Sequence, residues 1–142
     1  MTINHSIVRG LKHVVIPLIL ASLIYILLRK IKPLILIKLL LILDLDTNYY
    51  IELYGNSPLK YFFLYNLTDA LWAYSMTSFV ILATINDTFS IKIIYIISSL
   101  ILILSQEFLQ GIFLAGTFDW SDVVFLIAGF STSIFILKEC NP

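Results

Sequence analysis

Residues 105–130, SQEFLQGIFLAGTFDWSDVVFLIAGF, decide the fold, because they read as one apolar helix ending and another beginning. Gly116 lies in the short break, and Asp119 followed by Asp122 is the pattern of a helix N-cap and first turn. The flanking residues suit lipid-facing helices, yet Glu107 and Gln110 lie inside the first apolar run. The stretch therefore predicts two membrane helices joined by a tight turn, with acids from both sides of it on one membrane face.

The composition of the whole chain agrees with a lipid environment. Its 142 residues are 60% hydrophobic and 13% charged, with a mean hydropathy of +0.98. A soluble domain carries about a quarter charged residues, so the solvent predicted for this chain is a bilayer. The formal net charge is zero, which offers no electrostatic footprint for nucleic acid. The lone Cys140 forms no intrachain disulfide, and the first apolar run reads as an uncleaved anchor.

Four apolar segments approach the roughly 20 residues that span a bilayer. Backbone groups in lipid must be satisfied within the segment, so these spans are helices. We expect an all-α, polytopic membrane protein in which residues 1–142 form a single integral membrane domain. Its predicted spans cover about 11–28, 67–85, 89–114 and 120–137.

The segment 33–45, PLILIKLLLILDL, is shorter than a span and carries Lys38 near its middle. We interpret it as an interfacial or re-entrant helix between the first and second spans, and a fifth, short span is the alternative. An aromatic interface stretch follows it, with tyrosines at 49, 50, 54, 61 and 65. Asn66, with Asp69 three residues later, is the expected N-cap of the second span, and Asp87 or Thr88 that of the third.

With four spans, the start of the second, the end of the third and the start of the fourth share one membrane face. Polar side chains gather at these three places, and helical spacing puts several of them on common faces. On the fourth span, Asp122, Leu126, Gly129 and Ser133 form a line. We therefore predict a polar pocket open to one interface, made by Asp69, Trp72, Glu107, Gln110, Asp119 and Asp122.

Each of these residues also has a plain structural explanation. Asp119 and Asp122 cap a helix, Asp69 suits a first turn through the helix dipole, and Trp72 suits an interfacial anchor. Glu107 is harder to explain, because it lies about two turns inside its helix. An acid at that depth is costly unless it is protonated, paired or hydrated, and it marks a functional site by default.

The chemistry of the predicted pocket is limited to oxygen ligands and carboxylates. The two histidines, His5 and His13, fall at the opposite face, and no His/Cys cluster exists for zinc. No metal ligands or cofactor are assigned, although Mg²⁺ or Ca²⁺ would suit oxygen ligands. Crowded carboxylates would also suit proton transfer or general acid–base work. Basic residues of the first loop, Arg29, Lys30, Lys32 and Lys38, lie near the same face, where they contact lipid phosphates or an anionic headgroup.

At these positions the chain resembles the VanZ-like membrane protein family. Glu107 and Gln110 match its E-x-x-Q, and Phe118, Asp119 and Asp122 match its F-D-x-x-D. The similarity covers residues 66–137, with Gly129 at the family's glycine and Asp69 similar to its early Asp. The departures are Gly116, Leu126 and Ala73, where the family has Arg, Asn and His. The resemblance implies a divergent bacterial, cell-envelope protein of a family in which one case is linked to antibiotic resistance and most members are uncharacterised.

Three functions follow as hypotheses. The first is binding of a lipid, lipid-linked glycan or amphiphilic antibiotic through the acidic pocket, and we favour it over an enzyme because no catalytic residue is assignable. The second is a metal-assisted enzyme acting on a lipid phosphate, and the third a structural or immunity-type membrane subunit. The expected partners are membrane lipids, and the expected location is the bacterial inner (cytoplasmic) membrane.

Overall fold

The computed structural model describes residues 3–28, 58–110 and 118–138, and these are helical except for two short links at 84–88 and 118–119. The elements are α1 (Ile3–Gly10), a π-helical turn η1 (Leu11–Val15), α2 (Ile16–Leu28), α5 (Pro58–Ala83), α6 (Phe89–Gln110) and α7 (Trp120–Lys138). No strand occurs in the described residues, which confirms the all-α class. The interfacial helix expected over 33–45 lies outside them.

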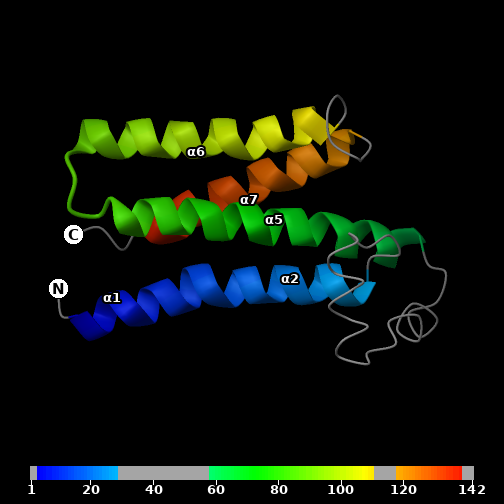
Figure 1. Cartoon of the computed structure of the whole chain (residues 1–142), viewed down its shortest axis with the longest axis horizontal. Coiled ribbons are helices and arrows are strands. Elements are labelled where there is room, and N and C mark those ends of the chain that lie inside the picture. Colours follow the sequence, from blue (N-terminus) through cyan, green and yellow to red (C-terminus); the bar gives the residue numbers. More distant parts are fainter. Residues whose placement is uncertain (1–2, 29–57, 111–117, 139–142) are drawn as a thin grey trace.

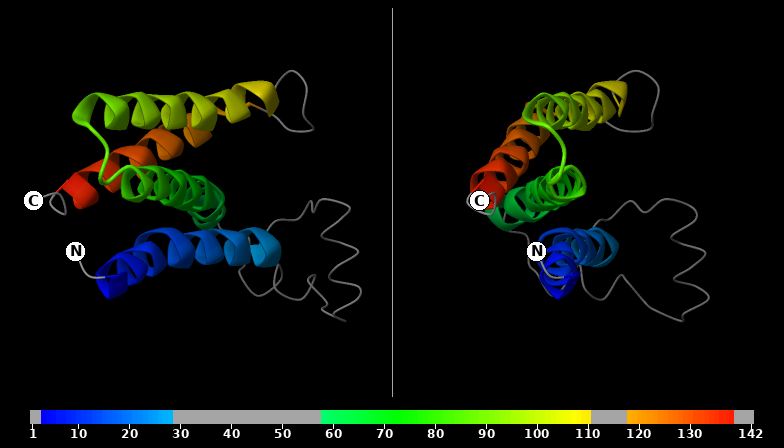
Figure 2. Two further views of the ribbon diagram at one scale, coloured as in Figure 1. Left: turned by 60° about the vertical axis from the view of Figure 1, so that its left-hand side comes forward. Right: turned by 90° about the vertical axis from the view of Figure 1, so that its left-hand side faces the viewer.

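Helix α5 is the centre of the arrangement. The first rod, made of α1, η1 and α2, packs against it, and so do α6 and α7 (Figures 1 and 2). Figure 1 also shows that α5 and α7 run in the same direction and α6 in the opposite one. As expected, the start of α5, the end of α6 and the start of α7 therefore lie at one end of the molecule, which we name the Glu107 end. The other end, where α1 begins and α5 ends, is named the Arg9 end.

Three of the described helical segments are long and apolar enough to cross a membrane: Ile7–Tyr25, Phe89–Leu109 and Trp120–Leu137. Many large apolar side chains of these segments face outwards, such as Leu102, Val124 and Phe135, which are 62–73% exposed. Helix α5 is longer, with 26 residues, but is more polar. Its position among the other helices explains this, because its polar side chains face protein instead of lipid.

Two helix boundaries differ from the sequence predictions. Helix α5 begins at Pro58, so the expected N-cap at Asn66 is wrong and this residue lies two turns inside the helix. Proline suits the first turn of a helix because its missing N–H has no helical partner there. Positions 61 and 65, two of the predicted interface tyrosines, lie in the first turns of α5. The first rod is helical from Ile3, eight residues before its predicted start.

The interior is built from small and hydroxylic side chains. Ala73, Ile103 and Leu126, one from each of α5, α6 and α7, form the buried hydrophobic cluster. Trp72, Met76 and Phe130 pack against it. Around it are buried serines and threonines, namely Ser75, Thr77, Ser78, Thr84, Ser99 and Ser133. Small side chains let helix backbones approach closely, which is how helices associate when lipid supplies no hydrophobic driving force between them.

The contact between α5 and α7 is the closest of these approaches. A Cβ atom added at Gly129 would collide with the backbone carbonyl of Ala70. One turn further along α7, the hydroxyls of Ser133 and Ser78 are 2.9 Å apart and share a hydrogen bond. The predicted line of Leu126, Gly129 and Ser133 is therefore confirmed as the buried face of α7.

The first rod is fastened to α5 through its π-turn. Pro17 has no backbone N–H to donate within this helix. Immediately before it, the Ile16 N–H donates to the Leu11 carbonyl, which is the wider hydrogen-bond spacing of a π-helix. The Ser75 hydroxyl donates to the Val14 carbonyl at 2.8 Å. The residues that precede Val14 and Ser75 also meet: the His13 Nδ1 atom and the Tyr74 hydroxyl are 2.6 Å apart. His13, which the sequence analysis set aside, is thus a buried helix-packing residue.

Candidate functional site

Three acidic residues lie one helical turn beyond the hydrophobic cluster, all towards the Glu107 end. Asp69 precedes Ala73 by four residues, Glu107 follows Ile103 by four, and Asp122 precedes Leu126 by four. Residues four apart on a helix share a face and are about one 5.4 Å pitch apart. Helix α6 runs opposite to α5 and α7, so four residues forward on α6 and four residues back on α5 and α7 all lead towards the Glu107 end. We name Asp69, Glu107 and Asp122 the polar layer.

Glu107 is the most buried member of the polar layer, with 4% of its surface exposed. Its Oε1 atom accepts a hydrogen bond from the backbone N–H of Asp119 at 3.3 Å. This bond is longer than the usual 2.9–3.0 Å for N–H···O, so it compensates only part of the cost of burying the acid. Among the described side chains, no lysine or arginine pairs with it.

Asp119 caps helix α7, as predicted. Its Oδ1 atom accepts from the Ser121 N–H at 2.9 Å, and its carbonyl accepts from the Val123 N–H at 3.4 Å. Its side chain is exposed, and its link to the polar layer is the backbone N–H that reaches Glu107. Asp122 lies in the first turn of α7, where the helix dipole favours an acid.

Asp69 is half-buried and lies about three turns inside α5. The dipole effect falls off within the first turn of a helix, so the first-turn explanation for Asp69 is wrong. Trp72 packs against the hydrophobic cluster and contributes to the core beside the polar layer. Gln110 is the last residue of α6, and its side chain lies outside the described residues, as do the basic residues of the first loop.

A set of aromatic rings joins α6 to the start of α7 at the same end. The Phe108 and Phe118 rings stack with centroids 5.3 Å apart. The edge-to-face pair of Phe118 and Trp120 has a centroid distance of 5.1 Å. Sequence reasoning missed Phe108 and Trp120, although their positions next to Glu107 and Asp119 were a usable signal. The rings fix how the two helices meet beside Glu107.

Asn66 is a second polar group that sequence reasoning misplaced. It lies one turn before Ala70, on the face of α5 that packs against α7, and is 3% exposed. Its amide nitrogen Nδ2 is buried and has no hydrogen-bond partner among the described residues. The sequence signal for its burial was the helical spacing of Asn66, Ala70 and Ala73, which puts the three residues on one face of α5. This end of the interior thus offers a hydrogen-bond donor as well as acids.

The carboxylates of the polar layer do not form a compact ligand set. In the described part of the chain, no three His, Cys, Asp or Glu side chains gather closely enough to hold a metal ion. What the arrangement offers chemically is a set of acceptors at the Glu107 end, of which Glu107 is the most buried.

Comparisons with protein-family models, curated proteins and solved structures gave no match for this chain. The resemblance of residues 66–137 to the VanZ-like family therefore stays a prediction.

Proposed function

We propose that the chain is an integral protein of a bacterial envelope membrane, in which the first rod, α5, α6 and α7 all span. In this proposal α5 is the fourth span. It is long enough, because 26 residues at 1.5 Å each cover about 39 Å. Its polar side chains are sheltered by the three apolar segments around it.

At the Glu107 end, the protein binds an amphiphilic envelope molecule through the polar layer. The observation that carries this proposal is the burial of Glu107, whose one hydrogen bond within the described part of the chain is a long one from a backbone N–H. A buried acid with no cationic partner among the described side chains gains most from a ligand that brings N–H or O–H donors. Sugar hydroxyls and amines are such donors, so the ligand class is a lipid-linked glycan, an amine-bearing lipid or an amphiphilic antibiotic.

Binding to the purified protein in lipid nanodiscs tests this proposal. The probes are a polyprenyl-linked disaccharide, phosphatidylethanolamine and a lipoglycopeptide. We expect Glu107→Gln and Asp122→Asn to weaken binding of one probe about ten-fold, because hydrogen bonds to charged groups contribute about 1.5–3 kcal/mol.

Asp87→Asn is the matched control, because Asp87 is an exposed acid in the link at the Arg9 end. It should bind as the unmodified protein does. Equal binding by the folded Glu107→Gln variant and the control would refute the proposal.

A structural role is the second candidate, and the Glu107–Asp119 hydrogen bond itself favours it. This bond joins α6 to Asp119, the residue that immediately precedes α7. In that case Glu107 holds a helical hairpin together in a membrane subunit, and its removal lowers stability without changing any binding.

A further inference from the structure

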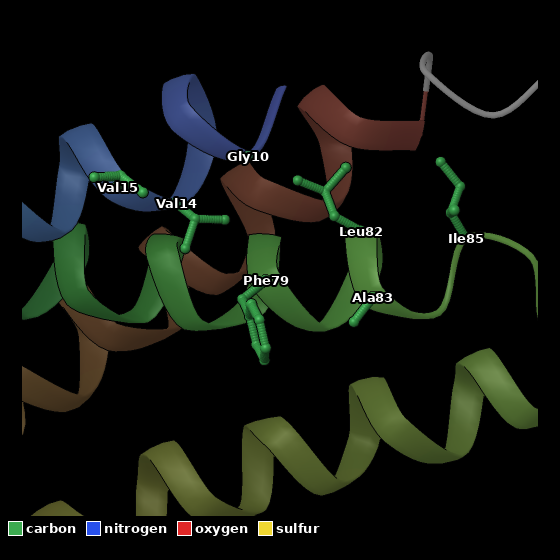
Figure 3. Close-up of a pocket in the computed structure, with 7 residues that line it drawn as sticks. All are labelled: Gly10, Val14, Val15, Phe79, Leu82, Ala83 and Ile85. Atoms are coloured by element: carbon green, nitrogen blue, oxygen red, sulfur yellow. The ribbon is translucent and has the colours of Figure 1, made fainter. Parts of the chain in front are cut away.

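A groove at the Arg9 end is separate from the polar layer. It has a volume of about 420 Å³. Figure 3 shows the residues that line it, which come from the end of α1, the π-turn, the last turns of α5 and the link that follows α5. Its lining residues, Gly10, Val14, Val15, Phe79, Leu82, Ala83 and Ile85, carry no polar side chain.

The separation of the two walls is set by hydrogen bonds. The π-turn carries Val14 and Val15, and it is tied to α5 by the His13–Tyr74 and Ser75–Val14 bonds of 2.6 and 2.8 Å. A Cβ atom added at Gly10 would meet no atom within 4 Å, so the rim of the groove is open space. The groove is therefore a feature of the fixed helix packing.

The surroundings of the groove are those of lipid near a membrane surface. It lies along Ile7–Tyr25, a segment apolar enough to span, and the neighbouring Val8 and Leu11 are 62% and 51% exposed. Water does not fill an apolar space of this kind, because it would lose its hydrogen bonds there. Hydrocarbon is the complementary occupant.

Charges at this end select the kind of lipid. Among the described side chains here, Arg9, Lys12 and Lys92 outnumber the single acid Asp87. Arg9 and Lys12 lie on the first rod, within two residues of Gly10 in the chain, and Gly10 lines the groove. Basic residues at the edge of a span attract the phosphate of anionic lipids.

We propose that this groove binds one acyl chain of an anionic phospholipid, whose phosphate lies at the level of Arg9 and Lys12. The proposal rests on the placement of the chain in a bilayer and is independent of the polar layer. The ligand proposed at the Glu107 end and the phospholipid proposed at the Arg9 end occupy two separate sites. Either proposal can therefore be refuted without affecting the other.

Native mass spectrometry of the protein released from phosphatidylglycerol nanodiscs tests the groove, with Gly10→Leu as the blocking variant. The backbone at Gly10 is right-handed helical (φ −58°, ψ −46°), so a leucine fits the helix while its side chain enters the open space. We expect the unmodified protein to retain one phospholipid and Gly10→Leu to retain at least ten-fold less. Ala83→Leu fills the groove from the other wall and serves if Gly10→Leu does not fold.

Ala128→Leu is the control, because Ala128 is exposed on α7 and takes no part in the groove. It should retain phospholipid as the unmodified protein does. The proposal is overturned if the unmodified protein retains no phospholipid, or if the folded blocking variants retain as much as Ala128→Leu.

A second measurement addresses the headgroup. In mixtures of phosphatidylglycerol and phosphatidylcholine, Lys12→Gln should reduce the preference for phosphatidylglycerol about five-fold, since each basic residue near a membrane surface contributes about 1 kcal/mol. Lys92→Gln, at the same end but on α6, should change the preference less than Lys12→Gln does. Equal effects of the two substitutions would contradict a phosphate at Lys12.

Discussion

Glu107 is the residue on which both functional candidates depend. Its carboxylate is nearly sealed from solvent, and its Oε1 atom accepts the N–H of Asp119. A carboxylate and a side-chain amide both provide this acceptor oxygen, but only the carboxylate carries charge. Substitutions at this one position can therefore separate the hydrogen bond from the charge.

We expect Glu107→Gln to keep the stability of the unmodified protein and Glu107→Ala to lose about 1 kcal/mol. The amide retains an acceptor for the Asp119 N–H, whereas alanine leaves it without this partner. Thermal unfolding in detergent micelles, followed by circular dichroism, measures the difference. If Glu107→Gln lowers the stability as much as Glu107→Ala does, the negative charge itself stabilises the contact between α6 and Asp119. The structural candidate is then preferred.

At the scale of the helices, the α5–α7 contact depends on the absence of a side chain at Gly129. The Ala70 carbonyl occupies the space that a Cβ atom would need, and a backbone atom cannot move aside as a flexible side chain can. Any larger residue must push the two helices apart and strain the nearby Ser78–Ser133 bond.

Gly129→Ala should therefore destabilise the protein by about 2 kcal/mol, within the usual cost of overpacking a tight interior. Gly10→Ala is the matched control, because its added Cβ meets nothing within 4 Å. It should stabilise the helix by about 0.5–1 kcal/mol through the better helix propensity of alanine. Unfolding midpoints in denaturant give both values, and equal effects would contradict the close approach of α5 and α7.

The π-turn makes a second prediction at this scale. Tyr74→Phe removes the hydroxyl that pairs with His13 Nδ1 and should cost about 1 kcal/mol, typical of an interhelical hydrogen bond in a membrane. Thr132→Val is the control, since the Thr132 hydroxyl bonds only within its own exposed helix face, to the Ala128 carbonyl. The same unfolding assay compares the two variants. A loss of stability from Thr132→Val as large as that from Tyr74→Phe would refute a stabilising role of the His13–Tyr74 hydrogen bond.

For the whole molecule, the number of spans decides which chain segments share a side of the membrane. With four spans, both termini and the 84–88 link lie on one side. A fifth span over 33–45 would move the N-terminus alone to the other side. The first rod, α5, α6 and α7 alternate in direction, as four spans require, and α1 begins and α7 ends at the Arg9 end (Figure 1).

Single cysteines placed along the chain test this topology with a membrane-impermeant thiol reagent. Every introduced cysteine is placed in a Cys140→Ser background. We expect Thr2→Cys, Asn86→Cys and, in the unmodified protein, the native Cys140 to be labelled from one side of sealed vesicles, and Asn48→Cys and Thr117→Cys from the other. Labelling of Thr2→Cys opposite to Asn86→Cys would establish a span between them that is not among the four.

The sequence by itself determined the all-α class, three of the four predicted segments as helices long and apolar enough to cross a membrane, and the cap at Asp119. These features depend on composition and on spacing along a single helix, which are local properties of the chain. It also placed Asp69, Glu107 and Asp122 at one end, because helix order alone fixes which ends of successive helices meet.

Only the tertiary structure decided which residues face one another. It showed that the Glu107 carboxylate meets the Asp119 backbone, that Gly129 meets Ala70 and that His13 meets Tyr74. It also moved the start of α5 to Pro58 and so placed Asn66 in the interior. Such pairings depend on the rotation and close approach of whole helices, and helical periodicity in one segment carries no information about the segment packed against it.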